Sequence, residues 1–350
     1  MALADETTPV RPGHAIDRPR LLDYLTRHVP GIAADATVRQ FRGGQSNPTF
    51  LVESGGRAFV LRKKPPGVLL PSAHAVDREY AVMKALAGTE VPVPKMLHLC
   101  QDDAILGTAF YIMEWVDGRV FWEPGLPGLS PAERHAVYDA MNEVLARLHK
   151  VDYRAVGLDG FGRPGNYFER QISRWSKQYR ASETERIEAM DRLIEWLPEN
   201  IPPGDETAVV HGDYRLDNMI FHAGEPRILA VLDWELSTLG HPLGDFTYQL
   251  IGWRLSGGLF RGVADLDLAA LGIPTEAEYI AAYCRRTGRE GVANLEWYLA
   301  YNMFRLACIL QGIMGRALDG TAASEHAVEQ GRRAKPMAEA AWRQIAALAG

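Results

Sequence analysis

The chain carries, from residue 208 to residue 218, the sequence Ala208-Val-Val-His-Gly-Asp-Tyr-Arg-Leu-Asp-Asn218, which Met219-Ile-Phe221 follows directly. The apolar residues at both ends are typical of short strands, and the polar residues between them are typical of a loop. This order of strand, loop and strand interrupts a second half of the chain that otherwise follows helical spacing. We therefore expect the chemistry of the protein in this segment.

Two residues of the predicted loop, Asp213 and Asn218, lie five positions apart. The catalytic loop of protein kinases has an aspartate and an asparagine at the same separation. In such a pair the carboxylate orients and deprotonates the attacking hydroxyl, while the neutral amide oxygen helps to hold Mg²⁺ without adding charge repulsion. The spacing predicts that Asp213 is a catalytic base and that Asn218 is a metal ligand.

A third candidate, Asp233, follows the apolar run Ile228-Leu-Ala-Val-Leu232 and lies fifteen positions after Asn218. A hairpin would return it to the same end of the sheet as Asn218. One carboxylate, one amide oxygen and phosphate oxygens are a sufficient ligand set for Mg²⁺. We predict that Asp213, Asn218 and Asp233 are catalytic, that Asn218 and Asp233 bind Mg²⁺, and that ATP is the co-substrate.

Two alternatives remain open. In the first, the chain is a hydrolase whose His211, Asp213, Asp233 and His241 bind zinc or manganese and activate water; in the second, it is a non-catalytic module that binds nucleotide. The sequence lacks a compact His-x-His or His-Glu-x-x-His pattern, and the position of His211 before a glycine favours a structural role in the loop. Asp245 is expected to cap the following helix and to hold the loop's backbone.

The rest of the chain has two parts of different texture. Up to about residue 115 it has β-favouring runs, at Phe50-Leu-Val52, Phe59-Val-Leu61 and Phe110-Tyr-Ile-Met113. After Ser130 the spacing is mostly helical, and Ser130-Pro-Ala-Glu133 combines an N-cap, a first-turn proline and a capping-box glutamate. Further helices are expected at about 77–86, 167–196, 276–287, 294–318 and 323–348. The contrast predicts a small sheet lobe joined to a larger helical lobe.

Composition excludes several classes of partner. The 350 residues are 47% hydrophobic, enough for one large or two ordinary domains. The net charge of -6, with both signs scattered, provides no basic face for nucleic acid. Polar residues interrupt the most apolar segment, 297–318, at helical spacing, so we expect a buried helix and no membrane partner.

The compartment is expected to be the cytoplasm. Asp5 and Glu6 lie near the start of the chain, where a secretory signal would have a basic region before an apolar one. The three cysteines are far apart and odd in number, which predicts reduced thiols rather than a disulfide framework.

Three segments resemble the motifs of the aminoglycoside phosphotransferase and choline kinase family: His211-Gly-Asp-Tyr-Arg-Leu-Asp-Asn218, Leu232-Asp-Trp-Glu235 and Gly240-His-Pro-Leu-Gly-Asp245. The resemblance extends over about residues 38 to 330. It implies an α+β, protein-kinase-like fold with a small N-terminal antiparallel-sheet lobe and a larger, mainly helical C-terminal lobe. It also implies the roles given above to Asp213, Asn218 and Asp233, with Asp245 anchoring the loop. This chain has His241 where many members have an aspartate.

The resemblance further implies a division of the chain and a set of nucleotide-binding residues. Residues 1–37 are expected to be an N-terminal extension, 38–116 the small lobe that covers the nucleotide, and 117–350 the helical lobe with the catalytic and metal-binding loops. Residues implied to bind the nucleotide are Gly43, Gly44, Ser46 and Asn47 in a phosphate-covering loop, Arg62 with its ion-pair partner Glu79, and Glu114 and Val116 through their backbones to adenine. Arg62 stands where protein kinases have lysine, and Lys63 or Lys64 could take its place.

Within that family, three other segments are most similar to the kinase-like domain fused to some acyl-CoA dehydrogenases: Phe59-Val-Leu-Arg-Lys-Lys-Pro-Pro-Gly67, Leu70-Pro-Ser-Ala-His74 and Gly165-Asn-Tyr-Phe-Glu-Arg-Gln-Ile-Ser-Arg-Trp175. This similarity implies a small-molecule hydroxyl acceptor of the hydroxyacyl-CoA type, such as a 4-hydroxyacyl-CoA, rather than an antibiotic. The protein is expected to be a monomer or a homodimer.

Overall fold

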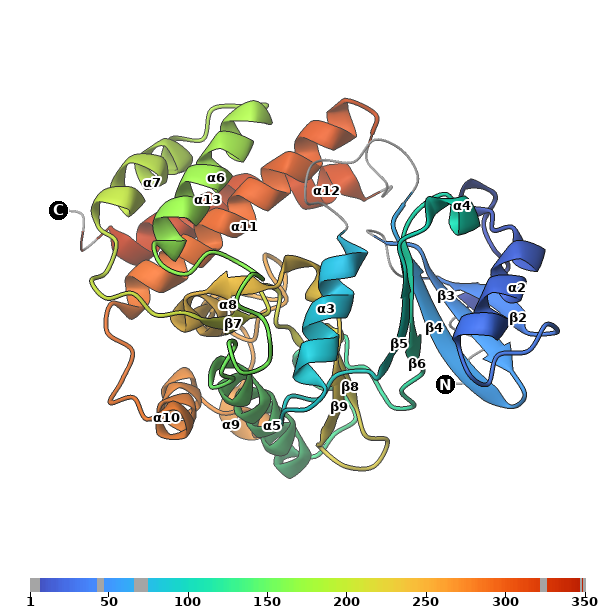
Figure 1. Ribbon diagram of the computed structural model, residues 1–350. Coiled ribbons are helices and arrows are strands. Elements are labelled where there is room, and N and C mark those ends of the chain that lie inside the picture. The colour runs from blue at the N-terminus through green and yellow to red at the C-terminus, as the bar shows by residue number, and fades with distance from the viewer. Residues whose placement is uncertain (1–6, 43–46, 66–74, 322–325, 347, 349–350) are drawn as a thin grey trace. The chain divides into compact units, whose positions relative to one another are not determined.

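The computed structural model of the protein describes residues 7–42, 47–65, 75–321, 326–346 and 348 (Figure 1). The chain divides into two compact units, which we call the sheet unit and the helical unit. The sheet unit comprises Met1–Arg119, Ile220–Ala223 and Leu229–Ser237, and the helical unit comprises Val120–Met219, Gly224–Ile228 and Thr238–Gly350. Such a division agrees with the predicted two-lobed α+β architecture.

The sheet unit contains a six-stranded sheet in the order β1-β2-β3-β4-β6-β5, in which every neighbouring pair is antiparallel. Its strands are β1 (Thr7–Thr8), β2 (Thr37–Phe41), β3 (Thr49–Ser54), β4 (Arg57–Lys63), β5 (Met96–Cys100) and β6 (Phe110–Glu114). The three β-favouring runs of the sequence lie in β3, β4 and β6 and form the centre of this sheet, as predicted.

Alternation along β4 gives the sheet two different faces. Phe59 and Leu61 are fully buried in the core that the sheet shares with α2 (Arg18–His28). Arg62 therefore points to the opposite face, because successive side chains of a strand point to opposite sides. On that opposite face lies α3 (Val76–Leu86), whose Glu79 accepts a hydrogen bond from Tyr111 of β6 at 3.0 Å.

Residues before position 38 belong to this unit from residue 7 onward. Leu21, Leu22 and Leu25 of α2 are almost completely buried against the sheet, and Asp17 caps the helix by accepting from Arg20 N. The segment expected to be an extension of the small lobe thus supplies one layer of its core. This unit also contains the 3-10 turns η1 (Pro12–His14) and η3 (Trp234–Leu236), and the short helix α4 (Asp103–Leu106).

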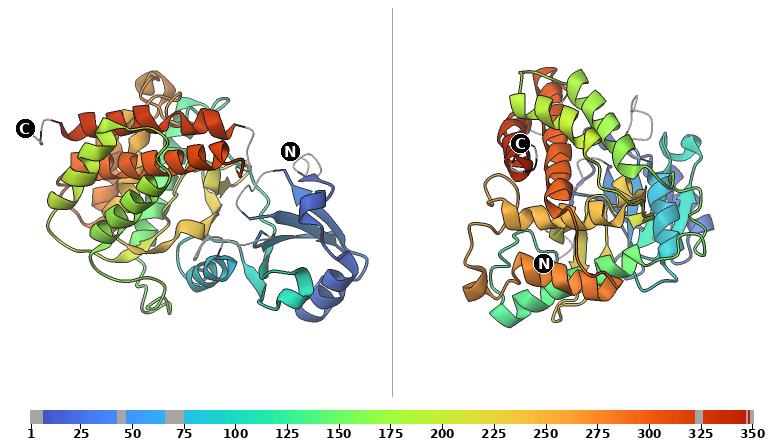
Figure 2. Two further views of the ribbon diagram at one scale, coloured as in Figure 1. Left: turned by 90° about the horizontal axis from the view of Figure 1, so that it is seen from above. Right: turned by 90° about the vertical axis from the view of Figure 1, so that its left-hand side faces the viewer.

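The helical unit is built around α11 (Leu295–Leu318), the buried helix that the sequence predicted. Its helices are α5 (Pro131–His149), α6 (Tyr167–Ala181), α7 (Glu188–Glu199), α8 (Pro242–Arg254), α9 (Leu268–Leu271), α10 (Glu276–Thr287), α11, α12 (Ala327–Gly331) and α13 (Ala334–Ile345). Figure 2 shows α11 and α13, the orange-red and red helices, side by side. Of the helices in the described ranges, none combines the length and apolar character needed to cross a bilayer.

Helix boundaries agree with the prediction in some places and differ in others. The capping box of Ser130 and Glu133 is formed at the start of α5. The single helix expected at 167–196 is two helices, because the chain leaves the helical path after Ala181. The expected helix at 323–348 consists, within the described residues, of the separate helices α12 and α13.

Four short strands carry the polar loops. In the helical unit β7 (Ala208–Val210) pairs with β10 (Thr238–Gly240) in antiparallel register. A second two-stranded sheet joins β8 (Met219–Phe221) and β9 (Ile228–Val231). The turn η2 (Leu216–Asn218) leads directly into β8. The predicted order of strand, polar loop and strand is therefore confirmed.

Candidate active site

The loop after β7 is held in place through its backbone. Gly212 has φ +82°, in the left-handed region that glycine adopts without penalty. The buried carboxylate of Asp245 accepts hydrogen bonds from His211 N at 2.7 Å and from Gly212 N at 2.8 Å. Arg305 of α11 donates to the carbonyl of Gly212. The loop conformation is thus fixed from both sides before Asp213.

Asp245 anchors the loop as predicted, but it does not cap the helix. The cap of α8 is His241, whose ring accepts from Leu243 N at 3.2 Å, and Pro242 occupies the first turn. Burial alone would raise the pKa of Asp245, but His149, at 3.3 Å, and the backbone N–H of His211 together lower it. Asp245 is therefore ionised when it receives the loop's two N–H groups.

Asp213 lies at the centre of a set of donors within the helical unit. Asn218 donates its amide N–H to the carbonyl of Asp213 at 2.9 Å and to Oδ2 of Asp213 at 3.2 Å. Tyr248 of α8 donates its hydroxyl to the other oxygen, Oδ1, at 2.6 Å. Arg215 Nε forms an ion pair with the same Oδ1 at 3.0 Å. The structure therefore brings Asp213 and Asn218 together and gives the carboxylate a fixed orientation.

The sheet unit holds the second group of predicted residues. Arg62 lies 3.1 Å from Oε2 of Glu79 and 2.6 Å from Oδ1 of Asp233. The expected ion pair of Arg62 with Glu79 is confirmed, and Asp233 is an additional partner. Burial alone would lower the pKa of Arg62, but the nearby carboxylates raise it, so the guanidinium stays charged. Burial raises the pKa of Glu79 against the opposing effect of Arg62.

Asp233 has an unusual backbone. Its φ is +63°, the left-handed conformation that non-glycine residues avoid at a cost of roughly 1–2 kcal/mol. Strained residues of this kind concentrate at functional sites, where surrounding contacts hold them. Here Arg62 holds the carboxylate, and Asp233 lies at the start of η3, directly after the strand β9 and Leu232.

Two basic residues of β4, Arg62 and Lys63, are alternatives for the cation that contacts the phosphates, and they differ in their contacts. Lys63 is buried and donates to the carbonyl of Leu106 at 3.2 Å, away from Glu79, and burial lowers its pKa. Asn47 is fully buried and donates to Glu79 Oε1 at 2.9 Å. Three other residues of the expected phosphate-covering loop, Gly43, Gly44 and Ser46, lie outside the described residues.

Glu114 ends β6, and Val116 follows it. The backbone N–H of Glu114 donates to the carbonyl of Lys95 at 3.0 Å. Its side chain is half-exposed and pairs with Arg57 and Lys95, at 3.7 Å in each case. The predicted contact of Glu114 and Val116 with adenine stays a prediction.

Each of the two histidines of the hydrolase alternative uses its ring Nδ1 to accept a hydrogen bond from a backbone N–H. His211 is fully buried and accepts from Asp213 N at 3.2 Å, which agrees with the expected structural role. His241 accepts from Leu243 N in the same way. Across the described ranges, no group of three or more His, Cys, Asp or Glu side chains is placed to hold a metal ion.

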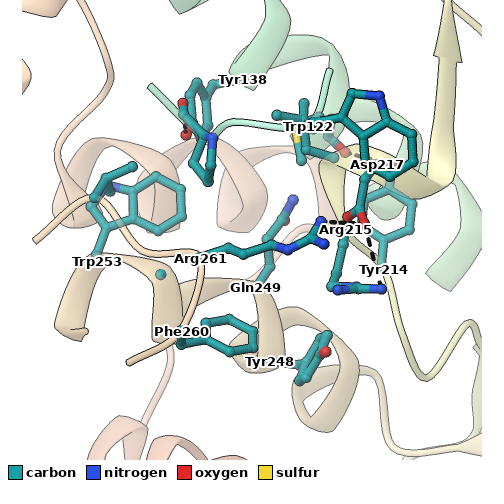
Figure 3. Close-up of a pocket in the computed structure, with 15 residues that line it drawn as sticks. Trp122, Tyr138, Tyr214, Arg215, Asp217, Tyr248, Gln249, Trp253, Phe260 and Arg261 are labelled. Atoms are coloured by element: carbon teal, nitrogen blue, oxygen red, sulfur yellow. Dashed lines mark hydrogen bonds and ion pairs between the residues drawn. The ribbon is translucent and has the colours of Figure 1, made fainter. Parts of the chain in front are cut away.

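A pocket in the helical unit is lined in part by Arg215 and Tyr248 (Figure 3), and both of these residues contact Asp213. Its lining is mainly aromatic, from Trp122, Tyr138, Tyr214, Tyr248, Trp253 and Phe260. Two arginines, Arg215 and Arg261, lie at one side and both pair with Asp217. Sequence reasoning did not identify this pocket, because its residues come from four separate parts of the helical unit.

Comparisons with known proteins agree with this arrangement. A model of the phosphotransferase enzyme family matches residues 37–299. Acyl-CoA dehydrogenase family member 10 of Mus musculus is 48% identical over 340 residues, which cover 96% of this chain and 32% of that protein. The chain thus spans about a third of the length of this relative, and the predicted similarity to kinase-like domains of such dehydrogenases is confirmed.

Two solved structures support the fold. A crystal structure from Ralstonia eutropha, named for the aminoglycoside phosphotransferases, has 56% sequence identity and a TM-score of 0.87, and the match covers 95% of this chain and 99% of that chain. The aminoglycoside phosphotransferase APH(4)-Ia, in a complex with AMP-PNP and hygromycin B, has 18% identity and a TM-score of 0.59, with 92% and 97% coverage. The fold and the family are those of small-molecule kinases, and the chain belongs to the phosphotransferase enzyme family.

Proposed function

We propose that this protein transfers the γ-phosphoryl group of ATP, with Mg²⁺, to a hydroxyl group of a small molecule. The observation that carries the proposal is the pairing of Asp213 with Asn218 after β7. Asn218 uses its amide N–H groups on Asp213, so its amide oxygen is the atom left for a cation. A carboxylate oriented in this way is suited to accept the proton of an attacking hydroxyl.

The residues present fit Mg²⁺ by the chemistry of their donor atoms. Asn218 offers an amide oxygen and Asp233 a carboxylate, and Mg²⁺ prefers hard oxygen ligands. Asn218 directly precedes β8 and Asp233 follows β9 by one residue, and these two strands pair with each other. Bound Mg²⁺ would neutralise charge on the transferring phosphoryl group. Arg62 and Asn47 are the candidates to bind the phosphates, together with Gly43, Gly44 and Ser46 of the phosphate-covering loop expected from the sequence. The backbones of Glu114 and Val116 are the candidates to bind adenine.

The reaction follows from the proposed roles. The acceptor oxygen attacks the γ-phosphorus while Asp213 accepts the hydroxyl proton. A bond forms between that oxygen and phosphorus, the bond to the β-phosphate oxygen breaks, and ADP leaves. Asp213 then releases the proton to solvent. The chain's own contribution is the orientation of the base and the binding of the phosphates.

For the acceptor we propose a hydroxyacyl-CoA, such as a 4-hydroxyacyl-CoA. The aromatic lining of the pocket beside Asp213 suits an apolar acyl chain. Arg261, a half-exposed residue at the pocket, suits an anionic group better than the amines of an aminoglycoside. The match to part of a protein named as an acyl-CoA dehydrogenase supports the same class of acceptor.

The test of the base is Asp213→Asn, which keeps the shape of the side chain and removes its negative charge. We expect kcat to fall by about 10²–10⁴-fold, the usual contribution of a general base, while binding of ATP with Mg²⁺ stays close to the wild-type value. Asp159→Asn is the matched control, because Asp159 is an exposed aspartate of the same unit that pairs with Arg154 at 3.8 Å. Normal turnover by Asp213→Asn would show that the base is another group.

The test of the acceptor compares three hydroxyl compounds with Mg²⁺ and ATP: a 4-hydroxyacyl-CoA ester, choline and hygromycin B. We expect phosphorylation of the CoA ester, detected as ADP release and as a mass increase of the acceptor. Phosphorylation of the cationic compounds alone would contradict the proposed class. ATP binding without transfer to any hydroxyl compound in a wider screen would favour the non-catalytic module.

A further inference from the structure

The hydroxyl of Tyr248 donates to Oδ1 of Asp213 at 2.6 Å, the shortest hydrogen bond that the described residues make to this carboxylate. Tyr248 lies on α8, three residues after Asp245, so the two side chains lie on one face of the helix. One face of α8 therefore holds both the backbone of the loop, through Asp245, and the side chain of Asp213, through Tyr248.

The tyrosine itself is held firmly. Its side chain is buried, with the guanidinium of Arg305 5.3 Å from the ring centroid and the ring of Phe260 packed edge-on at 6.0 Å. Burial, and then the charge of Asp213, raise the pKa of Tyr248 well above its ordinary value. The hydroxyl therefore keeps its proton and acts as a donor to Asp213.

The contacts of Asp213 distinguish its two oxygens. Oδ1 accepts a hydrogen bond from the hydroxyl of Tyr248 and forms an ion pair with Arg215 Nε at 3.0 Å. Oδ2 accepts a hydrogen bond from the amide of Asn218 at 3.2 Å. A carboxylate oxygen has about two acceptor sites. Among the contacts of the described residues, Oδ1 accepts the short hydrogen bond from Tyr248 and lies beside a cation, whereas Oδ2 accepts only the longer hydrogen bond from Asn218, so Oδ2 keeps an acceptor site for another donor.

We propose that Tyr248 is a positioning residue for the reaction: it holds Oδ1 of Asp213 so that Oδ2 faces the acceptor hydroxyl. The inference rests on the proposed function, since it assumes that Asp213 is the base. Tyr248 also lines the aromatic pocket, so one side chain touches the proposed acceptor site with its ring and orients the base with its hydroxyl. An acceptor in the pocket would therefore lie beside the residue whose hydroxyl holds the base.

The experiment is Tyr248→Phe, which removes the hydroxyl and keeps the ring. Its matched control is Tyr279→Phe, because Tyr279 is buried and donates an equally short hydrogen bond, 2.6 Å, to Gln249 on the same helix. Phosphoryl transfer to a 4-hydroxyacyl-CoA ester, and ATP hydrolysis without acceptor, are measured for both variants together with Tm.

We expect kcat of Tyr248→Phe to fall by about tenfold or more, the size expected for a lost hydrogen bond to a charged group. The KM values for ATP and the acceptor stay within about twofold of wild type, since the ring and the substrate contacts remain. Tyr279→Phe keeps the wild-type kcat, although its Tm falls by about as much as the Tm of Tyr248→Phe. A kcat for Tyr248→Phe that equals that of Tyr279→Phe would overturn the inference.

The two proposals fail in different ways. If Asp213→Asn is inactive but Tyr248→Phe is fully active, the base assignment stands and only the role of Tyr248 is wrong. If Asp213→Asn retains turnover, the base assignment itself is wrong, and with it the role given to Tyr248. A raised KM for the acceptor with unchanged kcat would make Tyr248 part of the pocket wall alone.

Discussion

Arg62 connects two carboxylates of different character. Glu79 is almost completely buried, with a side chain 1% exposed, whereas that of Asp233 is 32% exposed. A buried carboxylate needs a cationic partner, because an uncompensated charge in the interior is costly. Arginine suits this position better than the lysine of protein kinases, since its planar group reaches both carboxylates at once.

Arg62→Ala should lower the free energy of unfolding by about 3–5 kcal/mol at neutral pH, the usual effect of removing one partner of a buried pair. Glu79 then stays buried without its cation, so its folded-state pKa, already raised by burial, rises further. Between the ordinary and the raised value the folded state binds more protons than the unfolded state, and stability increases as pH falls through that window. The deficit relative to wild type should therefore shrink on acidification.

Urea denaturation at several pH values measures this effect. Arg57→Ala is the control, because Arg57 lies on the same strand but is 52% exposed and pairs loosely with Glu114 at 3.7 Å. Exposed pairs of this kind contribute less than about 1 kcal/mol. A deficit for Arg62→Ala that does not depend on pH would contradict the assignment to Glu79.

The first turn of α8 depends on a histidine. His241 caps the helix through its ring, packs against Phe168 with ring centroids 5.0 Å apart, and is 4% exposed. Burial lowers its pKa from 6.5 to about 4. The folded state therefore keeps this ring neutral at pH values where the unfolded chain would protonate it.

Because its folded-state pKa is lowered, His241 makes the protein less stable in acid. Between pH 6.5 and about 4 the unfolded state binds more protons than the folded state, so stability falls as pH falls through this window. The full loss from this one group is about 3 kcal/mol. His241→Asn keeps a side-chain acceptor at the cap and removes the titrating ring. It should lower stability at pH 7 through lost packing and reduce the acid-induced loss between pH 6.5 and 4.

Calorimetry across that pH range provides the measurement. His326→Asn serves as the control, since His326 lies in the same unit with a side chain 78% exposed. If His241→Asn loses as much stability on acidification as the wild type does, another group is responsible for the pH dependence.

Elements with strong local signals could be predicted from the sequence. Ser130-Pro-Ala-Glu133 starts α5, and the β-favouring runs form β3, β4 and β6, because caps and patterns there agree with the fold. The segment between α6 and α7 contains no proline or glycine that would predict a break in the helix. Gln311 of α11 stabilises this segment by donating to the carbonyl of Ser182 at 2.7 Å and to Thr184 Oγ1 at 2.8 Å. Tertiary contacts of this kind are not visible in local sequence.

Some residues of the candidate site could be predicted from the sequence, and others could not. Asp213, Asn218 and Asp245 could be found because the motif places them at fixed spacing. Tyr248 and Arg305 could not, since their roles depend on which face of α8 and α11 meets the loop. Arg305 gave a partial signal as a charged residue within the apolar stretch of α11.

At the scale of the whole molecule, the sheet unit is not one continuous segment. Arg119 and Phe221 exchange backbone hydrogen bonds of 2.8 Å in both directions, and η3, with its preceding Asp233, is also part of this unit. The boundary expected at residue 116 from the sequence could not include these returns, because they join positions far apart in the chain. Segments 220–223 and 229–237 belong to the same compact unit as the first 119 residues.

Binding of Mg²⁺ and ATP should stabilise the folded protein, because a ligand that binds only the folded state shifts the equilibrium away from unfolding. A ligand at about 100 times its Kd adds about 2.7 kcal/mol to the folded state, which should raise Tm by several degrees. The shift should disappear with EDTA and in Asp233→Ala, which removes both carboxylate oxygens, and it should persist in Asp213→Asn. An equal shift in Asp233→Ala would exclude Asp233 as a ligand of the cation.

The partners of the loop after β7 come from late positions in the chain. The carbonyl of Gly212 accepts a hydrogen bond from Arg305 of α11. Asn302, also of α11, donates to the carbonyl of Gly244 of α8 at 3.0 Å. During synthesis on a ribosome, which proceeds from the N-terminus, His211, Asp213 and Asp245 emerge before the helix that fixes them. A nascent chain that ends before residue 295 therefore lacks these contacts, and the enzyme should become competent only after α11 has left the exit tunnel.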